Sequence, residues 1–486
     1  MTSLSSPVVK EIPYQDPCSV YEAVRASRSL LFESVKGSER IARYSFIGVD
    51  PYLEFTVKEG SVEIDICGRK ALSSRRPLEC LRELVTCYRQ KPFDGLPPFQ
   101  GGAAGLLCYD FVRYLERIPS TTFDDLNLPD AHFFMFDRLI SFDHKEGRAW
   151  IIVCPGARET VPGYAGSLSP REEQVAGAEE EVQVLFNKIA QKREPTVFSP
   201  RPEKHIEKCI DVRSDITKEE YISMVQRAKE YIASGDIFQT NLSLRVSADL
   251  TGYDSWNIYK ILREINPSPF AAYADFGEYQ IVSSSPERLV RLSHGVIDTR
   301  PIAGTRPRGR DLGEDDRLRA ELLLNEKERA EHIMLIDLER NDIGRIADYG
   351  TVRVDELMVT EDYSHVMHIV SNLEGYLAAG KDCFDVIAAV YPGGTITGVP
   401  KVRCMEIIDE LETFRRGVYT GSLGYIGFNG CMDLNIIIRT FLIKNNRAYI
   451  QTGAGIVADS DPDQEYIECL KKAEALLRTL DKLNPD

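Results

Sequence analysis

A seam near residue 154 divides this chain of 486 residues into two long parts of different pattern, and it is the strongest constraint on the fold. In residues 1–153, short β-like runs such as 44–49, 62–66 and 149–153 alternate with turns. Residues 154–205 contain a Gly-, Pro- and Ser-rich stretch, a charged helix-like segment from 171 to about 192, and a proline-punctuated linker. In residues 206–486 helices and strands interleave. Because the chain exceeds the usual size of one hydrophobic core, we expect two subdomains or one large compound sheet.

Composition excludes several classes of partner. The hydrophobic content of 43% and the charged content of 28% are ordinary for a globular enzyme. The formal net charge of −16 argues against a nucleic-acid partner and means that an anionic substrate needs a locally basic pocket. The eleven cysteines are scattered without disulfide-like clustering, and there is no signal-like start or membrane-length apolar run. We therefore expect a reduced, cytoplasmic protein without a membrane partner.

Residues 461–480 predict an amphipathic helix that carries a charged stripe. Asp461 offers a capping side chain, and Pro462 suits the first helical position. Apolar residues then recur at helical spacing, while Glu465, Glu468 and Lys472 fall together on the neighbouring stripe. Two carboxylates and one ammonium group could hold a divalent cation and an anionic substrate together. The alternative is a solvated surface stripe.

Glu328 and Glu331 repeat the Glu-x-x-Glu spacing in a second helix-like run, from residue 316 to about 338. Mg²⁺ prefers oxygen ligands, keeps several waters, and needs only one or two carboxylates together with a substrate oxygen. No Cys/His group has the spacing of a zinc site, so the two pairs favour Mg²⁺. The spacing is common by chance, and it does not show by itself that the two segments meet.

Two glycine-containing loops and one histidine are further candidates. Residues 299–310 place four arginines around Gly304, so this segment is either a turn or a loop that binds carboxylates. Residues 392–401 predict a strand–turn–helix junction whose N–H groups could bind an anion. His368 alternates with apolar residues in a β-like run, which is typical of a packed core histidine as well as of a catalytic one.

Together these segments resemble the chorismate-utilising enzymes, specifically the large subunits of anthranilate synthase and aminodeoxychorismate synthase. The resemblance covers nearly the whole chain and rests on residues 300–310, 325–332, 337–342, 364–371, 392–401, 439–440 and 453–472, with 33–34 and 43–48 in the amino-terminal half. It implies an α+β fold in which two large antiparallel β-sheets pack face to face with helices outside. It also implies an active site within residues 206–486, Mg²⁺ as cofactor and chorismate as substrate.

The resemblance implies a partner as well. The chain has no glutaminase nucleophile segment of the Gly-x-Cys-x-Gly kind. We therefore expect a separate glutamine amidotransferase small subunit, in a heterodimer or heterotetramer. A non-catalytic binding protein on the same fold is a distant alternative, but it predicts gaps among the acid/base and metal positions, and those positions are filled.

The resemblance also assigns roles to individual residues. Glu331 and Glu468 resemble the magnesium ligands, with Glu465 as a further carboxylate. His368 resembles the general acid/base beside the C4 hydroxyl, a role that a near-neutral pKa would suit. The remaining catalytic candidates are Glu328 and Thr395. The substrate-binding candidates are Gln239, Gly304, Thr305, Tyr419, Arg439, Gly453, Ala454, Gly455 and Lys472, among which Arg439 and Tyr419 resemble contacts to the enolpyruvyl carboxylate and Lys472 resembles part of the ring-carboxylate site.

Gln239 indicates ammonia as the nucleophile. Isochorismate and salicylate synthases of this family carry a lysine there that activates water, whereas glutamine has no basic nitrogen. The residues then disagree between the two ammonia-using branches. Ala303 resembles anthranilate synthase, because many aminodeoxychorismate synthases have a lysine there that attacks C2. Residues 392–398 and Asn435 resemble the other branch, so we favour 4-amino-4-deoxychorismate, for 4-aminobenzoate and folate, over anthranilate and pyruvate, for tryptophan.

Glu33, Ser34, Pro269 and Phe270 resemble the pocket in which anthranilate synthases bind feedback tryptophan. Ala271 stands where those enzymes usually have methionine, which removes packing against the indole ring. The segment is therefore either a tryptophan site or only structural in this chain.

Overall fold

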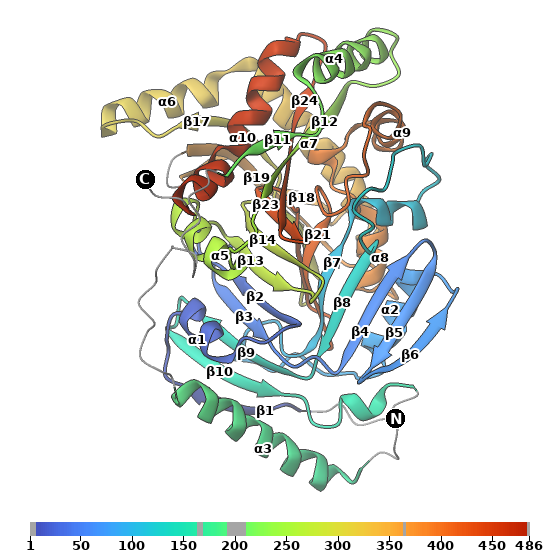
Figure 1. Cartoon of the computed structure of the whole chain (residues 1–486), viewed down its shortest axis with the longest axis vertical. Helices are drawn as coiled ribbons and strands as arrows, with labels where there is room; N and C mark the ends of the chain where they lie inside the picture. The colour runs from blue at the N-terminus through green and yellow to red at the C-terminus, as the bar shows by residue number, and fades with distance from the viewer. Residues whose placement is uncertain (1–5, 163–168, 192–209, 363–365, 484–486) are drawn as a thin grey trace.

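The computed structural model describes residues 6–162, 169–191, 210–362 and 366–483 (Figure 1). In this part of the chain the strands form two antiparallel sheets of 12 strands each. In order across the first sheet lie β1 (Val8–Ile12), β10 (Arg148–Val153), β9 (Arg138–Asp143), β3 (Tyr44–Gly48), β2 (Ser29–Glu33), β13 (Phe270–Asp275), β14 (Tyr279–Ser285), β23 (Thr440–Lys444), β24 (Arg447–Ile456), β12 (Gln239–Asp249) and β11 (Val212–Ser214), with β20 (Gly398–Val399) paired to β12.

The second sheet has the same number of strands, and its edge strand β17 lies against helices from the middle of the chain. Its order is β17 (Ile302–Pro307), β19 (Val366–Tyr376), β16 (Val296–Thr299), β15 (Arg288–Ser293), β22 (Met432–Asn435), β21 (Ser422–Gly427), β7 (Gly102–Leu107), β8 (Ala131–Phe136), β4 (Leu53–Lys58), β5 (Ser61–Ile66) and β6 (Arg69–Ser73), with β18 (Arg353–Asp362) paired to β19.

Both sheets combine strands from the two parts of the chain. β2 pairs with β13 in the first sheet, and β7 pairs with β21 in the second. The residues on either side of the seam therefore share their sheets and fold together. Of the two architectures that the length allowed, the structure has the large compound one. Most of the linker predicted within 154–205 lies outside the described residues.

The two sheets face each other across a buried apolar layer. Leu30 and Phe46 of the first sheet and Leu106 and Phe134 of the second belong to this layer. β8 is buried along its whole length because it lies inside the second sheet with both faces covered. The α+β fold expected from the family resemblance, with two antiparallel sheets packed face to face, is confirmed.

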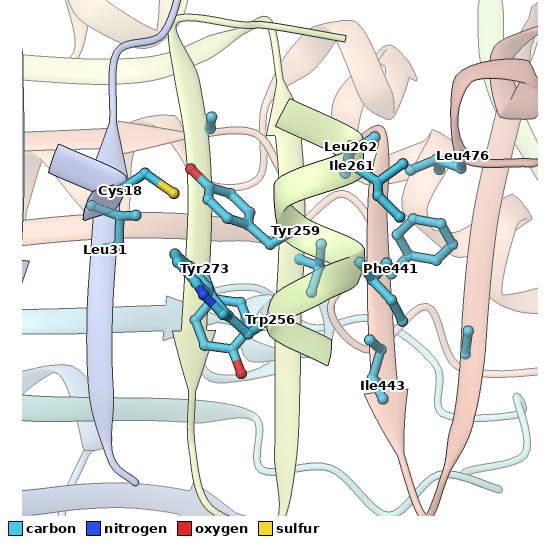
Figure 2. Close-up of a cluster of buried hydrophobic side chains, with 14 of the residues drawn as sticks. Cys18, Leu31, Trp256, Tyr259, Ile261, Leu262, Tyr273, Phe441, Ile443 and Leu476 are labelled. Carbon is cyan, nitrogen blue, oxygen red and sulfur yellow. The ribbon is translucent and has the colours of Figure 1, made fainter. Parts of the chain in front are cut away.

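Helices cover the outer faces of both sheets. α5 shows how: Asp254 caps it by accepting a hydrogen bond from the Trp256 backbone N–H at 3.1 Å. Its Trp256 and Tyr259 rings stack at 5.2 Å, and Trp256 meets Tyr273 of β13 edge-on at 5.1 Å (Figure 2). The first sheet is covered by α1 (Pro17–Val24), α3 (Arg171–Ala190), α4 (Lys218–Ala233), α5 (Ser255–Ile265) and α10 (Pro462–Leu483), and the second by α2 (Pro77–Thr86), α7 (Glu326–Gly344) and α8 (Cys383–Val390).

Two local predictions were wrong. The helix expected from 316 to 338 is two helices, α6 (Leu312–Leu324) and α7, because the Asn325 side chain accepts from the Glu328 N–H at 3.0 Å and starts a new helix. The junction at 392–401 follows helix α8 rather than a strand, and it contains a short 3₁₀ turn (Gly394–Ile396) before α9 (Lys401–Leu411). Among the described residues, no helix has the length and apolar character needed to span a membrane.

Candidate active site

The predicted site residues gather near one edge of each sheet, where α7 and α10 lie against the strands (Figure 1). They come from β12 (Gln239), β17 (Gly304, Thr305), α7 (Glu328, Glu331), β19 (His368), the 3₁₀ turn (Thr395), the segments that flank β21 and β23 (Tyr419, Arg439), β24 (Gly453, Ala454, Gly455) and α10 (Glu465, Glu468, Lys472).

Two glycines of β24 let polar side chains approach the strand closely. A Cβ atom at Gly453 would lie 2.6 Å from Asn241 Oδ1 and 2.7 Å from Tyr419 Oη. A Cβ atom at Gly455 would lie 2.6 Å from Gln239 Nε2. A Cβ atom at either position would force these side-chain ends to move, so glycine at both positions allows the polar groups to lie this close to the strand.

Two cations of the site are held by backbone groups. Lys472 Nζ donates to the Gly453 carbonyl oxygen at 3.0 Å and pairs with Glu468 at 2.7 Å, one helical turn away. Arg439 Nη1 donates to the Lys472 carbonyl oxygen. In the described part of the chain, no carboxylate forms an ion pair with Arg439, and burial lowers its pKa. Its guanidinium group can therefore bind the carboxylate of a substrate.

The carboxylates of α7 and α10 fit a hard cation. Glu331 accepts a hydrogen bond from Gln239 Nε2 at 3.2 Å. Burial raises the pKa of Glu331 and of Glu465, and the charge of Glu468 adds to both rises. Within the described residues, no three His, Cys, Asp or Glu side chains converge closely enough to hold a metal by themselves. Carboxylates that repel one another can be stabilised by Mg²⁺, which takes its other ligands from water and substrate.

His368 is a neutral hydrogen-bonding group. A bulge at Gly304 interrupts the pairing of β17 with β19 and brings His368 Nδ1 to 3.2 Å from the Gly304 carbonyl oxygen and 3.0 Å from Thr305 Oγ1. A carbonyl oxygen only accepts, so Nδ1 carries the proton and Nε2 is left as an acceptor. The near-neutral pKa expected from the sequence was wrong, because burial lowers the pKa of His368 to about 4.

Glu287 is a site residue that the sequence analysis missed. It lies between β14 and β15, is buried, and its pKa is raised by burial to about 8, although the nearby Thr395 hydroxyl and Ile302 N–H group oppose the rise. Among the described residues, neither Glu287 Oε1 nor Thr395 Oγ1 has a hydrogen-bond partner of normal geometry. A buried carboxyl group that stays protonated near neutral pH can donate a proton to a substrate.

The arginines of residues 299–310 are largely occupied by protein carboxylates. This favours the structural alternative for these side chains over a ligand-binding cluster. Arg300 pairs with Glu361 at 2.8 Å, Arg306 with Glu328 at 3.1 Å and Arg308 with Asp315 at 2.7 Å.

The residues of the candidate tryptophan site line a different cavity, with a volume of 460 Å³. Glu33, Ser34, Pro269 and Phe270 all lie on its wall, and none of the active-site residues above does. The Glu33 carboxylate is already bound by Tyr259 Oη at 2.6 Å and by Arg263 at 2.7 and 2.8 Å. These bonds hold β2 to α5, so Glu33 has a structural role whether or not a ligand binds.

Comparison with known proteins shows the family of the chain. A model of the chorismate binding enzymes matches residues 27–478. The chain belongs to this family. It is 42% identical over 485 residues to anthranilate synthase component 1 of Acetivibrio thermocellus, covering 98% of this chain and 95% of that protein. It is also 42% identical over 477 residues to aminodeoxychorismate synthase component 1 of Bacillus subtilis, covering 98% of this chain and 97% of that protein.

Solved structures show the same fold. Anthranilate synthase component I from Streptococcus pneumoniae superposes with a TM-score of 0.76 at 37% identity, covering 89% of this chain and 92% of that one. The menaquinone-specific isochorismate synthase from Escherichia coli gives a TM-score of 0.68 at 19% identity, covering 98% and 95%, which shows the fold alone. This chorismate-binding enzyme is therefore of the anthranilate synthase and aminodeoxychorismate synthase type.

Proposed function

We propose that the enzyme aminates chorismate with ammonia, in a Mg²⁺-dependent reaction that gives 4-amino-4-deoxychorismate. The observation that carries amination is Gln239, which lies beside Gly455 and Glu331. Its amide has no basic nitrogen and cannot remove a proton from water, whereas ammonia needs no such activation. The amide oxygen Oε1 is buried and, within the described residues, without a hydrogen-bond partner, so it can accept a hydrogen bond from an N–H group.

The two carboxylates of chorismate have cationic partners in the site. Arg439 and Tyr419 are suited to the enolpyruvyl carboxylate, and Lys472 is suited to the ring carboxylate. Glu331 and Glu468, with Glu465 beside them, would hold Mg²⁺, which would bind the ring carboxylate and offset its negative charge.

The proposed reaction uses two neutral groups, one to transfer a proton and one to orient the substrate. The protonated Glu287 donates its proton to the leaving C4 hydroxyl, so the C4–O bond breaks and water departs. Ammonia supplies the electron pair of the new C–N bond, and the surplus proton on nitrogen returns to the Glu287 carboxylate. His368 Nε2 accepts a hydrogen bond from the substrate and orients it.

The 4-amino product is supported by the loop that carries Thr395. Where this chain has Gly393, the anthranilate branch tends to have alanine. A Cβ atom at Gly393 would lie 3.0 Å from Ile436 Cδ1 and 3.2 Å from Leu289 Cδ1, so an alanine here would crowd both side chains. Anthranilate synthesis is the second candidate. Ala303 favours it, whereas the 42% identity to one relative of each name favours neither candidate.

The product decides between these candidates. Incubation with chorismate, Mg²⁺ and ammonium at alkaline pH is expected to give, by liquid chromatography and mass spectrometry, a 4-amino compound that retains its enolpyruvyl group. A separately added lyase should convert it to 4-aminobenzoate. Direct formation of 2-aminobenzoate and pyruvate would establish the second candidate, and unchanged chorismate would refute both.

The ammonia source is proposed to be a separate glutamine amidotransferase subunit. Both relatives above are named component 1. Ammonium has a pKa of about 10, near that of lysine, so well under ~1% is nucleophilic at neutral pH. The enzyme alone should therefore use ammonium salts but not glutamine, and addition of the partner should allow glutamine to support turnover at neutral pH. Glutamine-dependent activity of the rigorously purified single chain would contradict this.

A further inference from the structure

The Arg416 guanidinium group, which the reaction above does not use, is buried and has all five of its N–H donors occupied. Its side chain is only 1% exposed. The acceptors are both carboxylate oxygens of Glu412 at 2.8 and 3.0 Å, the Ile396 carbonyl oxygen at 3.0 Å, the Asn241 carbonyl oxygen at 2.7 Å and Thr420 Oγ1 at 3.3 Å. A lysine could not reproduce this set, because its three donors share one nitrogen.

Apart from Glu412, the acceptors belong to three separate segments, and each segment carries a residue of the candidate site. Ile396 directly follows Thr395 in the 3₁₀ turn. The Asn241 side chain lies against Gly453. Thr420 directly follows Tyr419, whose ring also lies 5.5 Å from the guanidinium group. One side chain thus joins the turn, strand β12 and the loop that carries Tyr419.

The ion pair itself is anchored to the first sheet. Glu412 Oε1 accepts from the Ser243 backbone N–H at 2.9 Å and from Ser243 Oγ at 2.8 Å. Both charged groups are buried, and a buried ion pair is weak evidence for a role in stability alone, because apolar replacements are often neutral or stabilising. The five hydrogen bonds of Arg416 instead fix the relative positions of the segments that supply the acceptors.

We propose that Arg416 is a positioning residue that holds Thr395, Asn241 and Tyr419 in the arrangement needed for turnover. This inference rests on the proposed amination of chorismate. Displacement of a catalytic group by about 1 Å can cost roughly 100-fold in rate. Arg416→Lys, which keeps the charge, is therefore expected to lower kcat/KM for chorismate by about 100-fold.

A matched control separates positioning from general loosening of the fold. Arg245 lies on β12, the strand that carries Asn241. It is also buried, and it pairs with Asp125 and Asp215 at 2.5 Å. Arg245→Lys also replaces a buried guanidinium group by an ammonium group. It should change kcat/KM by no more than about threefold, while its shift in Tm should be similar to that of Arg416→Lys. In Arg416→Lys the Mg²⁺ concentration for half-maximal rate should stay unchanged, because Arg416 does not contact the carboxylates of α7 or α10.

The assay follows chorismate consumption with ammonium in the full chain, together with thermal unfolding. An Arg416→Lys protein within threefold of wild type, or one whose loss matches that of Arg245→Lys, would overturn the inference. If Arg416→Lys does not fold, Ser243→Ala decides: it removes the hydrogen bond from Ser243 Oγ to Glu412 and the one that Ser243 Oγ accepts from Gln451 Nε2. It should lower kcat about fivefold with a Tm shift no larger than that of Arg245→Lys, whereas full activity would overturn the inference. An inactive wild-type enzyme would instead refute the proposed function.

Discussion

Glu287→Gln tests whether the buried carboxyl group supplies the proton for the leaving hydroxyl. The substitution keeps the shape of the side chain and removes its acidic proton. Burial raises the pKa of Glu287 from an ordinary 4.5 to about 8. With that pKa, about 90% of the enzyme is protonated at pH 7 and about 10% at pH 9. The rate of wild type, divided by the concentration of free ammonia, should therefore fall about tenfold per pH unit above pH 8.

The assay is a pH–rate profile of chorismate consumption at saturating Mg²⁺, with each rate corrected for free ammonia. In Glu287→Gln the fall above pH 8 should disappear, and kcat at pH 7 should drop by about 10²–10⁴-fold, the usual contribution of general acid catalysis. Glu181→Gln is the control, since Glu181 on α3 also has a raised pKa, of about 7, but lies on the covered outer face of the first sheet. A normal rate in Glu287→Gln, or a profile unchanged from wild type, would refute the assignment.

Glu287 should also make stability depend on pH. Its pKa is raised in the folded state, so the folded protein keeps a proton that the unfolded chain releases. This stabilisation is full below about pH 4.5 and is lost as the pH rises through the window up to about 8. Thermal unfolding should therefore show that the Tm of wild type falls relative to that of Glu287→Gln as the pH is raised from 6 to 9. A constant Tm difference would show that the carboxyl group does not titrate in this window.

Four further substitutions test the remaining assignments. Glu331→Gln and Glu468→Gln should each abolish turnover at saturating Mg²⁺ and chorismate while the protein stays folded; near-normal activity of either would remove the assigned metal site. Gly455→Ala should displace the Gln239 amide, lowering kcat about tenfold at a cost of about 1–3 kcal/mol in the free energy of unfolding, and an unchanged kcat would show that the amide position does not matter. Ala271→Met should bind L-tryptophan about fivefold more tightly than wild type by calorimetry, because added packing is worth about 1 kcal/mol, and equal affinities would contradict a tryptophan site in the 460 Å³ cavity.

The local sequence pattern was sufficient to predict individual helices and strands. The runs at 44–49, 62–66 and 149–153 correspond to strands β3, β5 and β10, because short runs rich in β-branched and aromatic residues between turns are typical of strands. α10 begins at Pro462 with Asp461 accepting from the Gln464 N–H at 3.0 Å, as the capping pattern predicted. The pairing of β2 with β13 joins segments far apart in the sequence, and no local pattern contains that information. The sheet arrangement could be anticipated only through the family resemblance.

Candidate site residues could be named from the sequence where the residue type indicates a role. They could not be named where the role depends on burial of the side chain. Glu331 and Lys472 were predicted as site residues because carboxylates and an ammonium group at helical spacing can hold a metal and an anion, and because the family resemblance assigns them these roles. Glu287 was missed because its proposed role depends on burial, and burial is a tertiary property; the flanking strands are buried in the structure although each contains several polar residues. The same cause explains His368, whose pKa falls to about 4 because the surrounding chain excludes water.

The choice of product reduces to the direction from which ammonia reaches the ring. Ala303 has no nucleophilic group, so ammonia itself must form the new C–N bond in either branch. Proton donation to the C4 hydroxyl is also common to both branches, because that hydroxyl leaves in each. Neither Glu287 nor the Mg²⁺ carboxylates can therefore distinguish C2 from C4. What differs is where ammonia is held, and Gln239 at the start of β12 offers a buried acceptor for it. A substitution at Gln239 that changes the ratio of 2-amino to 4-amino product, and not merely the rate, would show that this end of the site sets the direction of attack; an unchanged ratio would assign that choice to the Thr395 loop.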